Sequence, residues 1–153
     1  MFCYNQLMSI DKSNWHYETA VEYNPEVTDD ALLWEIAANH ITSLWLWFIR
    51  RGWVEEEYLD PIEEFRIELQ KAEAGECTFG SLFMRYFDGV LDDSILKPEA
   101  QSFLTHILPK DDNSASKWYD VFIGENLYCK PENRKDFSKS QDFLDSEYEA
   151  FLQ

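Results

Sequence analysis

The sequence is poor in the residues that mark disulfide frames, nucleotide-binding loops and basic binding surfaces. Its three cysteines, Cys3, Cys77 and Cys129, are an odd number without CxxC spacing, which predicts free thiols in a reducing compartment. The five glycines form no P-loop, GxGxxG or GxSxG motif. Lysine and arginine together number 13 against 30 acidic residues, which argues against bare nucleic acid and anionic membranes as ligands, because both bind clustered cations.

Long apolar runs are also missing. The strongest run covers residues 44–49 and is followed at once by Arg50 and Arg51, so it is far too short to cross a bilayer. The first twelve residues have neither a basic leader nor an apolar run of the length found in signal peptides. We therefore expect a cytoplasmic protein.

The chain does have aromatic residues and negative charge in quantity. Hydrophobic residues make up 45% of its 153 positions and aromatic residues 16%, which predicts one domain with its own core. The formal net charge is −17, which is either a solubility device or the complement of a basic partner. Residues 1–76 carry 16 acidic and 5 basic side chains, whereas residues 77–153 carry 14 and 8. A partner-facing acidic surface is therefore expected in the first half.

Residues 28–52 are predicted to form one long central helix, with its helical part at 29–51. Thr28, Asp29 and Asp30 supply capping oxygens and negative charge at its start, and Gly52 can adopt the left-handed conformation that ends a helix. Apolar residues occupy most of its circumference, which predicts that it is buried. The positions on the main stripe are Leu33, Ala37, Ile41, Leu44 and Phe48.

The fold class predicted from these patterns is all-α, a single-domain helical bundle over residues 1–153. Residues 1–27 are expected to form an aromatic arm, extended or with a short strand, that lies against the central helix. Residues 53–153 are expected to supply the covering helices, and residues 130–139 a surface loop. The predicted covering elements are a single turn at 55–59 and helices at 61–74, 79–87, 97–108, 117–126 and 140–152.

The three histidines, His16, His40 and His106, stand in no metal-binding spacing such as HExxH, so neither a metal nor a cofactor is expected. His40 interrupts the apolar helix. The simpler interpretation is a core histidine hydrogen-bonded to the N-terminal arm or a neighbouring helix. The alternative is a general base or a pH-sensitive contact in an enzyme pocket with Trp15 and His16. No catalytic residue is predicted.

One dense acidic cluster is predicted to contact a partner. Such a surface would steer a basic protein on encounter, and neighbouring aromatic residues would supply affinity at its centre. A nuclease has a basic cleft that an acidic surface could occupy. The predicted contact residues are Glu55, Glu56, Glu57, Asp60, Glu63 and Glu64, together with Trp53 and Tyr58.

Short aromatic motifs spread between Trp15 and Phe122 carry a family resemblance. They are Trp15-His16-Tyr17, Ala38-Asn39-His40-Ile41 with Trp47 and Gly52, Phe79-Gly80-Ser81-Leu82, Phe87-Asp88-Gly89-Val90-Leu91, Leu96, Phe103 and Trp118-Tyr119-Asp120-Val121-Phe122. With these motifs the chain resembles an uncharacterised family of small acidic bacterial proteins associated with immunity genes of polymorphic toxin systems. It departs from that pattern at Ala100, where glycine is expected, and from Gly124 onward.

The resemblance implies a cytoplasmic immunity protein that neutralises a cognate toxin effector, and it transfers no binding residues. Together with the charge it favours an inhibitor without enzymatic activity that covers the active site of a nuclease-like toxin. Two alternatives stay open. One is the small enzyme with a pocket around His40 and His16, and the other is an acidic regulatory adaptor for a different basic protein.

Overall fold

The computed structural model describes residues 9–108, 118 and 127–153 and is mostly helical. The all-α prediction is confirmed, with one two-stranded antiparallel sheet. The elements are β1 (Ser9–Lys12), the 3-10 helix η1 (Ser13–Trp15), α1 (Tyr17–Tyr23), α2 (Asp30–Ala37), α3 (Asn39–Arg50), η2 (Glu56–Leu59), α4 (Ile62–Glu73), α5 (Phe79–Phe87), β2 (Val90–Asp92), η3 (Asp93–Ile95), α6 (Pro98–Ile107) and α8 (Arg134–Phe151). The predicted helix 117–126 falls outside the described residues except for Trp118, which is buried. Across the described ranges, no helix has the length and apolar character needed to cross a membrane.

The segment predicted as one central helix is instead two helices, α2 and α3. The backbone leaves the helical conformation at Ala38, which has φ −95° and ψ 2°. The predicted ends are correct: the Asp29 side chain accepts a hydrogen bond from the backbone of Ala31 at the start, and Gly52 has φ +72° at the end. The prediction of a single helix over 29–51 was therefore wrong only in its middle, where the helix is interrupted.

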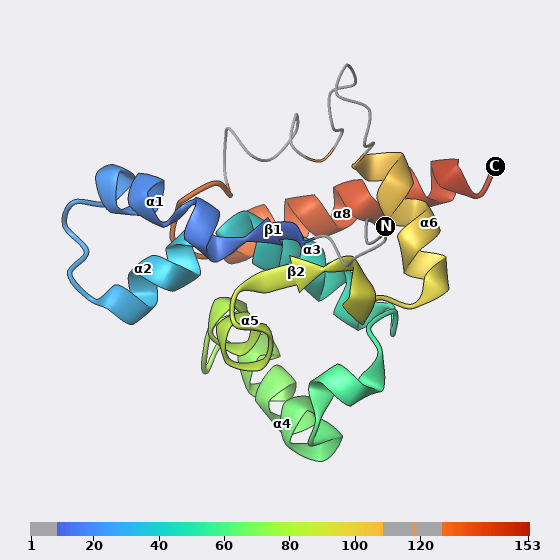
Figure 1. Cartoon of the computed structure of the whole chain (residues 1–153), viewed down its shortest axis with the longest axis horizontal. Helices are drawn as coiled ribbons and strands as arrows, with labels where there is room; N and C mark the ends of the chain where they lie inside the picture. The colour runs from blue at the N-terminus through green and yellow to red at the C-terminus, as the bar shows by residue number, and fades with distance from the viewer. Residues whose placement is uncertain (1–8, 109–117, 119–126) are drawn as a thin grey trace, which may run out of the picture.

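Helix α3 lies at the centre of the fold and is buried along nearly its whole length. Figure 1 shows it crossing the middle of the molecule, with α8 beside it, α4 and α5 below and the α1–α2 pair at one end. Trp45 is fully buried, and its ring contacts Phe83 and Phe87 of α5 with centroid distances of 5.3 and 5.6 Å. Trp47 packs at 5.0 Å from Phe103 of α6. Aromatic pairs of this kind add to the free energy gained by burying apolar surface.

Helix α8 comes much later in the sequence than α3, but it packs against α3 and covers it. It begins at Arg134, so the prediction of a surface loop over 130–139 was wrong for its second half. The Asn133 side chain caps it by accepting from the backbone N–H of Lys135 at 2.9 Å. Gln141 donates to the carbonyl of Ser43 at 2.9 Å, and the indole N–H of Trp47 donates to Asp145 at 2.9 Å. Polar contacts therefore fix the register of α8 on α3.

The described part of the N-terminal arm, from residue 9 onward, contains the predicted short strand and also the helices η1 and α1, which were not predicted. Strand β1 pairs with β2 in a register that sets Asp11 opposite Leu91, and the chain then turns through η1 into α1. The backbone N–H of Ser13 donates to the carbonyl of Gly89 at 2.8 Å. Tyr17 stacks on Trp34 of α2 with ring centroids 4.2 Å apart. This arrangement brings residues 11 and 16 beside the first turn of α3.

The covering segment after α3 follows the predicted order of elements with a small shift. Helix α4 begins at Ile62, one residue later than predicted, and the Asp60-Pro61 peptide bond is cis. Helix α5 begins where predicted, because the Thr78 hydroxyl accepts from the backbone of Ser81 at 3.1 Å. The acidic turn η2 and the start of α4 thus lie next to each other at one end of the molecule (Figure 1).

Candidate functional site

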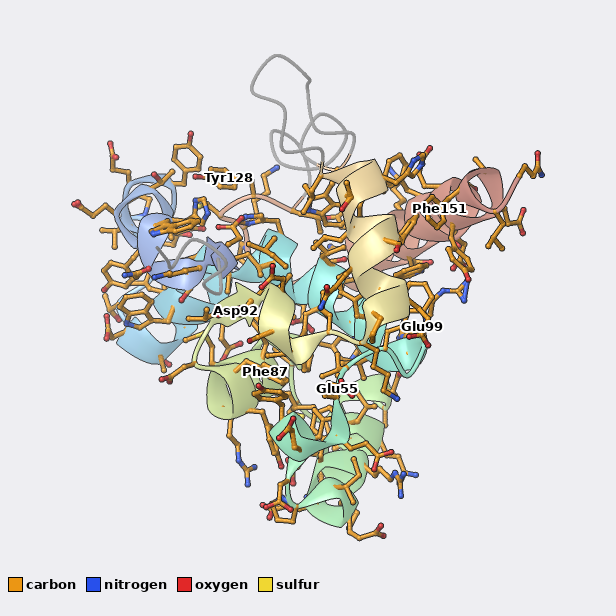
Figure 2. All side chains as sticks on the ribbon, turned by 45° about the vertical axis from the view of Figure 1, so that its right-hand side comes forward. Glu55, Phe87, Asp92, Glu99, Tyr128 and Phe151 are labelled. Atoms are coloured by element: carbon orange, nitrogen blue, oxygen red, sulfur yellow. The ribbon has the colours of Figure 1, made fainter. Side chains whose placement is uncertain are left out.

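The predicted partner-binding cluster forms a continuous stretch from the end of α3 through η2 into α4, which we call the η2–α4 patch. Most of its side chains reach solvent: Glu56, Glu57, Asp60, Glu63 and Glu64 are exposed and Glu55 is half-buried. Tyr58 is 39% exposed between them. The patch lies in the lower part of the molecule in Figure 2, where Glu55 is labelled.

Only part of this negative charge is neutralised. Glu63 pairs with Arg66 at 3.2 Å and Glu64 pairs with Arg85. Among the residues that the structure describes, no lysine or arginine forms an ion pair with the other four carboxylates of the patch. These four are Glu55, Glu56, Glu57 and Asp60. The negative charge of these four carboxylates is therefore available for ion pairs with a basic partner.

The two aromatic residues of the patch have different positions. Tyr58 is accessible, whereas Trp53 is half-buried and packs 5.2 Å from Tyr148 and 5.5 Å from Trp47. Trp53 therefore supports the core beneath the patch more than it offers a contact surface. Ile67 on α4 is 55% exposed, because it lies on the opposite side of the helix from the buried Phe65 and Ala72, and it was not predicted as a site residue.

A second acidic and aromatic surface lies on α1 and the turn before it. Trp15 is 56% exposed and Tyr23 63% exposed, so both depart from the expectation that the arm lays its aromatic residues against the central helix. Glu18, Glu22 and Glu26 are exposed in the same segment. This surface was not predicted, because its residues show no helical period strong enough to tell the inner face from the outer one.

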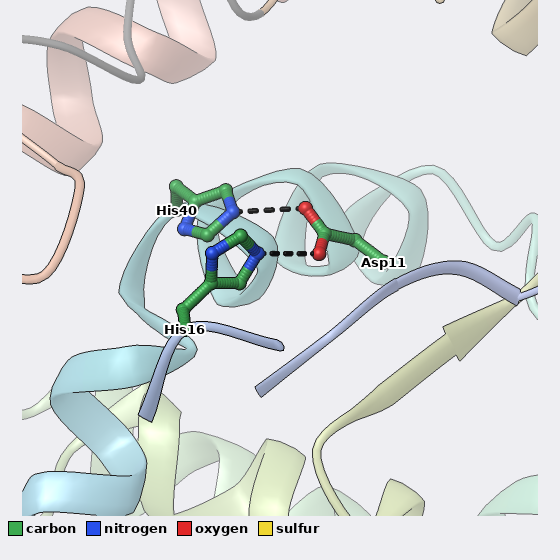
Figure 3. A group of neighbouring side chains, drawn as sticks. All are labelled: Asp11, His16 and His40. Atoms are coloured by element: carbon green, nitrogen blue, oxygen red, sulfur yellow. Dashed lines mark hydrogen bonds and ion pairs between the residues drawn. The ribbon is translucent and has the colours of Figure 1, made fainter. Parts of the chain in front are cut away.

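Asp11, His16 and His40 meet beneath this second surface, although they come from three separate segments. The Nε2 atom of His16 donates to Oδ1 of Asp11 at 2.7 Å, and the Nε2 atom of His40 donates to Oδ2 at 2.9 Å (Figure 3). Both nitrogens must carry the proton, because an ionised carboxylate only accepts. The hydroxyl of Tyr128 lies 2.8 Å from Nδ1 of His16 and continues the network.

Burial determines the electrostatics of this cluster. His40 is fully buried, and its desolvation lowers its pKa, while the hydrogen bond to Asp11 acts in the opposite direction with smaller effect. Burial likewise raises the pKa of Tyr128, and it raises the pKa of Cys129 to about 11. At neutral pH the Cys129 thiol is therefore protonated and unsuited to act as a nucleophile. The favoured interpretation of His40, a core histidine bonded to the arm, matches its contact with Asp11.

A pocket of about 410 Å³ lies where η1, α2, α5 and β2 approach one another. Its lining residues are Lys12, Ser13, Asn14, Trp34, Met84, Asp88 and Val90. They include neither His16 nor His40, so the pocket gives no support to the alternative of an enzyme cavity around these histidines. Tyr128 and Glu55, labelled far apart in Figure 2, show that the histidine cluster and the η2–α4 patch occupy different regions.

Comparison with protein families places most of the chain in one group. Residues 9–132 match the family described as a domain of unknown function, DUF7832. The chain belongs to this family. No curated protein and no solved structure matches it. The DUF7832 match contains the η2–α4 patch, the α1 surface and the whole Asp11, His16, His40 and Tyr128 network, whereas α8 begins after it.

The sequence predicted the η2–α4 patch as a cluster of neighbouring carboxylates, and one alternative placed His16 and His40 together, but Asp11 and Tyr128 were not predicted as their partners. The patch is local, since its carboxylates are neighbours along the chain. Asp11 is a single acidic residue in a segment without periodicity, and Tyr128 lies 112 residues after His16. Spacing rules cannot detect such a set, because its members become neighbours only when β1, α3 and the segment after residue 126 pack together.

Proposed function

We propose that this DUF7832 protein is an immunity or inhibitor protein that binds a cognate bacterial toxin effector in the cytoplasm and neutralises it. The η2–α4 patch would cover the basic active-site surface of the toxin. The observation that carries the proposal is a group of four carboxylates in the patch that form no ion pair with any described lysine or arginine. These are Glu55, Glu56, Glu57 and Asp60. Tyr58 stands among them as the accessible aromatic residue.

The physical basis is electrostatic steering followed by contact. A net charge of −17 produces a negative field around the molecule that accelerates its encounter with a basic partner. Unpaired carboxylates at the point of contact complement lysine and arginine across the interface, and an accessible tyrosine provides apolar area with little loss of side-chain entropy. A nuclease-like toxin is the partner that fits best, because it needs a basic cleft for its own substrate.

A regulatory adaptor for another basic protein would use the same surface, so the toxin must be tested directly. The chain should be expressed in bacteria together with the protein encoded by the neighbouring gene. We expect the neighbouring protein alone to stop growth, co-expression to restore it, and the two proteins to purify as a stable complex. If the neighbouring protein is harmless, or if it stays toxic in the presence of the chain, the proposal is wrong.

Removing charge from the patch should slow association with that partner. Replacing Glu55, Glu56 and Glu57 together by glutamine is expected to lower the association rate constant on the order of tenfold at low salt, with a smaller change in dissociation, because rim charges act mainly on encounter. Surface plasmon resonance at two salt concentrations measures both constants.

The matched control replaces Glu18, Glu22 and Glu26 of the α1 surface by glutamine, which changes the net charge by the same amount. The control should slow association much less than the patch variant. Equal effects of the two variants would mean that overall charge, and not the η2–α4 patch, guides binding. Stronger slowing by the control would move the contact surface to α1.

A further inference from the structure

We propose that Asp11, His16 and His40 bind one divalent transition-metal ion, with Zn²⁺ as the representative ion. This site lies apart from the η2–α4 patch and does not depend on the proposed function. One oxygen of Asp11 and one ring nitrogen of each histidine lie within 4.8 Å of one another. The absence of HExxH spacing predicts no metal site, but that reasoning covers only ligands on one helix, and these three come from β1, the turn before α1 and α3.

The donor set suits this class of ion. Imidazole nitrogen is a preferred ligand of Zn²⁺ and of the neighbouring divalent ions, and two imidazoles with one carboxylate leave a further coordination position open. Calcium and magnesium are poor candidates because they select oxygen ligands. The side chains are well protected, since that of His40 is fully buried and those of Asp11 and His16 are 6% and 15% exposed. This burial would limit the access of bulk water to the ligand atoms.

The convergence of the two rings on one carboxylate is the geometric argument. Both histidines direct Nε2 at Asp11, and their ring centroids are 4.7 Å apart. An ion would take the place of the two Nε2 protons that now make the hydrogen bonds. Zinc holds nitrogen and oxygen ligands at about 2.0–2.2 Å, which places ligand atoms roughly 3.3 Å apart in a tetrahedral arrangement. Rotation of His16, the more accessible ring, would supply the adjustment.

Tyr128 completes the site as a positioning residue. Its hydroxyl is 2.8 Å from Nδ1 of His16, the ring nitrogen that does not face Asp11. With an ion on Nε2, Nδ1 carries the proton and donates to the Tyr128 oxygen. A second contact of this kind fixes the tautomer and the orientation of a metal-bound histidine. The ligands and their support thus join four segments of the chain.

The test is calorimetric titration of the full chain with ZnCl₂ after treatment with a chelator. We expect one equivalent to bind and the Tm to rise, because an ion that binds only the native state stabilises it. His16→Ala should weaken binding at least tenfold, while His106→Ala, which alters a histidine paired with Glu147 at 3.3 Å, should leave binding unchanged. Tyr128→Phe should weaken it about tenfold through the orientation of His16. Circular dichroism checks that each variant is folded.

Titration with Co²⁺ separates this site from binding by cysteines. The near-ultraviolet spectrum of the Co²⁺-loaded chain should lack thiolate charge-transfer bands, and the visible d–d bands of the bound ion should be lost in His16→Ala. Asp11→Asn, which preserves the size of the side chain, provides a second ligand variant should His16→Ala fail to fold, and it should also weaken binding at least tenfold. No binding by the parent chain, thiolate bands, or an equal loss in His106→Ala would overturn the proposal.

Discussion

Asp11→Ala is expected to lower the free energy of unfolding by about 3–5 kcal/mol, the usual loss when one partner of a buried charged contact is removed. The Asp11 residue is only 4% exposed, and it accepts hydrogen bonds from His16 and His40 and from the backbone N–H of Lys12. Alanine removes the acceptor of all three donors at once. It also breaks the connection that holds β1 and the turn before α1 against α3.

Asparagine at the same position separates the loss of charge from the loss of shape. It offers one acceptor and one donor group, so it can serve only one of two Nε2 protons. His16 can move its proton to Nδ1 and donate to Tyr128, which leaves Asp11→Asn with a smaller loss of about 1–2 kcal/mol. Urea unfolding of both variants with a chelator present measures the difference. If Asp11→Ala costs less than about 1 kcal/mol, the carboxylate does not anchor the arm as described.

Gly89→Ala is expected to destabilise the protein by about 2–5 kcal/mol, the sum of a left-handed backbone penalty and overpacking. Gly89 has φ +72° and lies in the turn between α5 and β2. A methyl group there would lie 2.9 Å from Sδ of Met84 and closer still to Oγ of Ser13. Because the Gly89 carbonyl accepts from the backbone of Ser13, moving the turn away would weaken the pairing of β1 with β2.

Gly75→Ala is the matched control for the Gly89 variant. Gly75 has φ +82° but no atom within 4 Å of the position of an added Cβ, so only the backbone penalty of about 1–2 kcal/mol applies. Thermal unfolding compares the two variants. Combining Ser13→Ala with Gly89→Ala should recover part of the stability, since the nearest contact is removed. Equal losses at Gly75 and Gly89 would show that crowding plays no part.

The parts of the fold that could be predicted are those encoded by neighbouring residues. Thr78 before an apolar stripe predicts the start of α5, and Gly52 after Arg50 and Arg51 predicts the end of α3. The break at Ala38 has no such signal, since neither glycine nor proline occurs there. The break occurs next to two hydrogen bonds with residues far away in the sequence. The Asn39 side chain donates to the Leu127 carbonyl, and His40 donates to Asp11.

Helix α8 shows a different kind of error, because its starting signal was present. Asn133 followed by Asp136 is an ordinary helix start, with a capping side chain and negative charge in the first turn. The lysines and arginine of this segment suggested a loop, but Lys135 and Lys139 lie on the solvent-facing side of the helix, and Arg134 donates to the carbonyl of Ala72. For the site, the carboxylates of the η2–α4 patch were predictable because they are local in sequence. The Asp11 cluster was not, because it depends on tertiary packing.

The pairing of α3 with α8 also has a consequence for biosynthesis. Helix α3 ends at Arg50, yet Ser43 and Trp47 bond to Gln141 and Asp145, which lie 98 residues later in the chain. During translation this helix, which the fold buries along nearly its whole length, therefore emerges well before the helix that covers it. Until α8 has been synthesised, the nascent chain must keep this tryptophan-containing segment from aggregating, which makes it a natural client for chaperones that act at the ribosome.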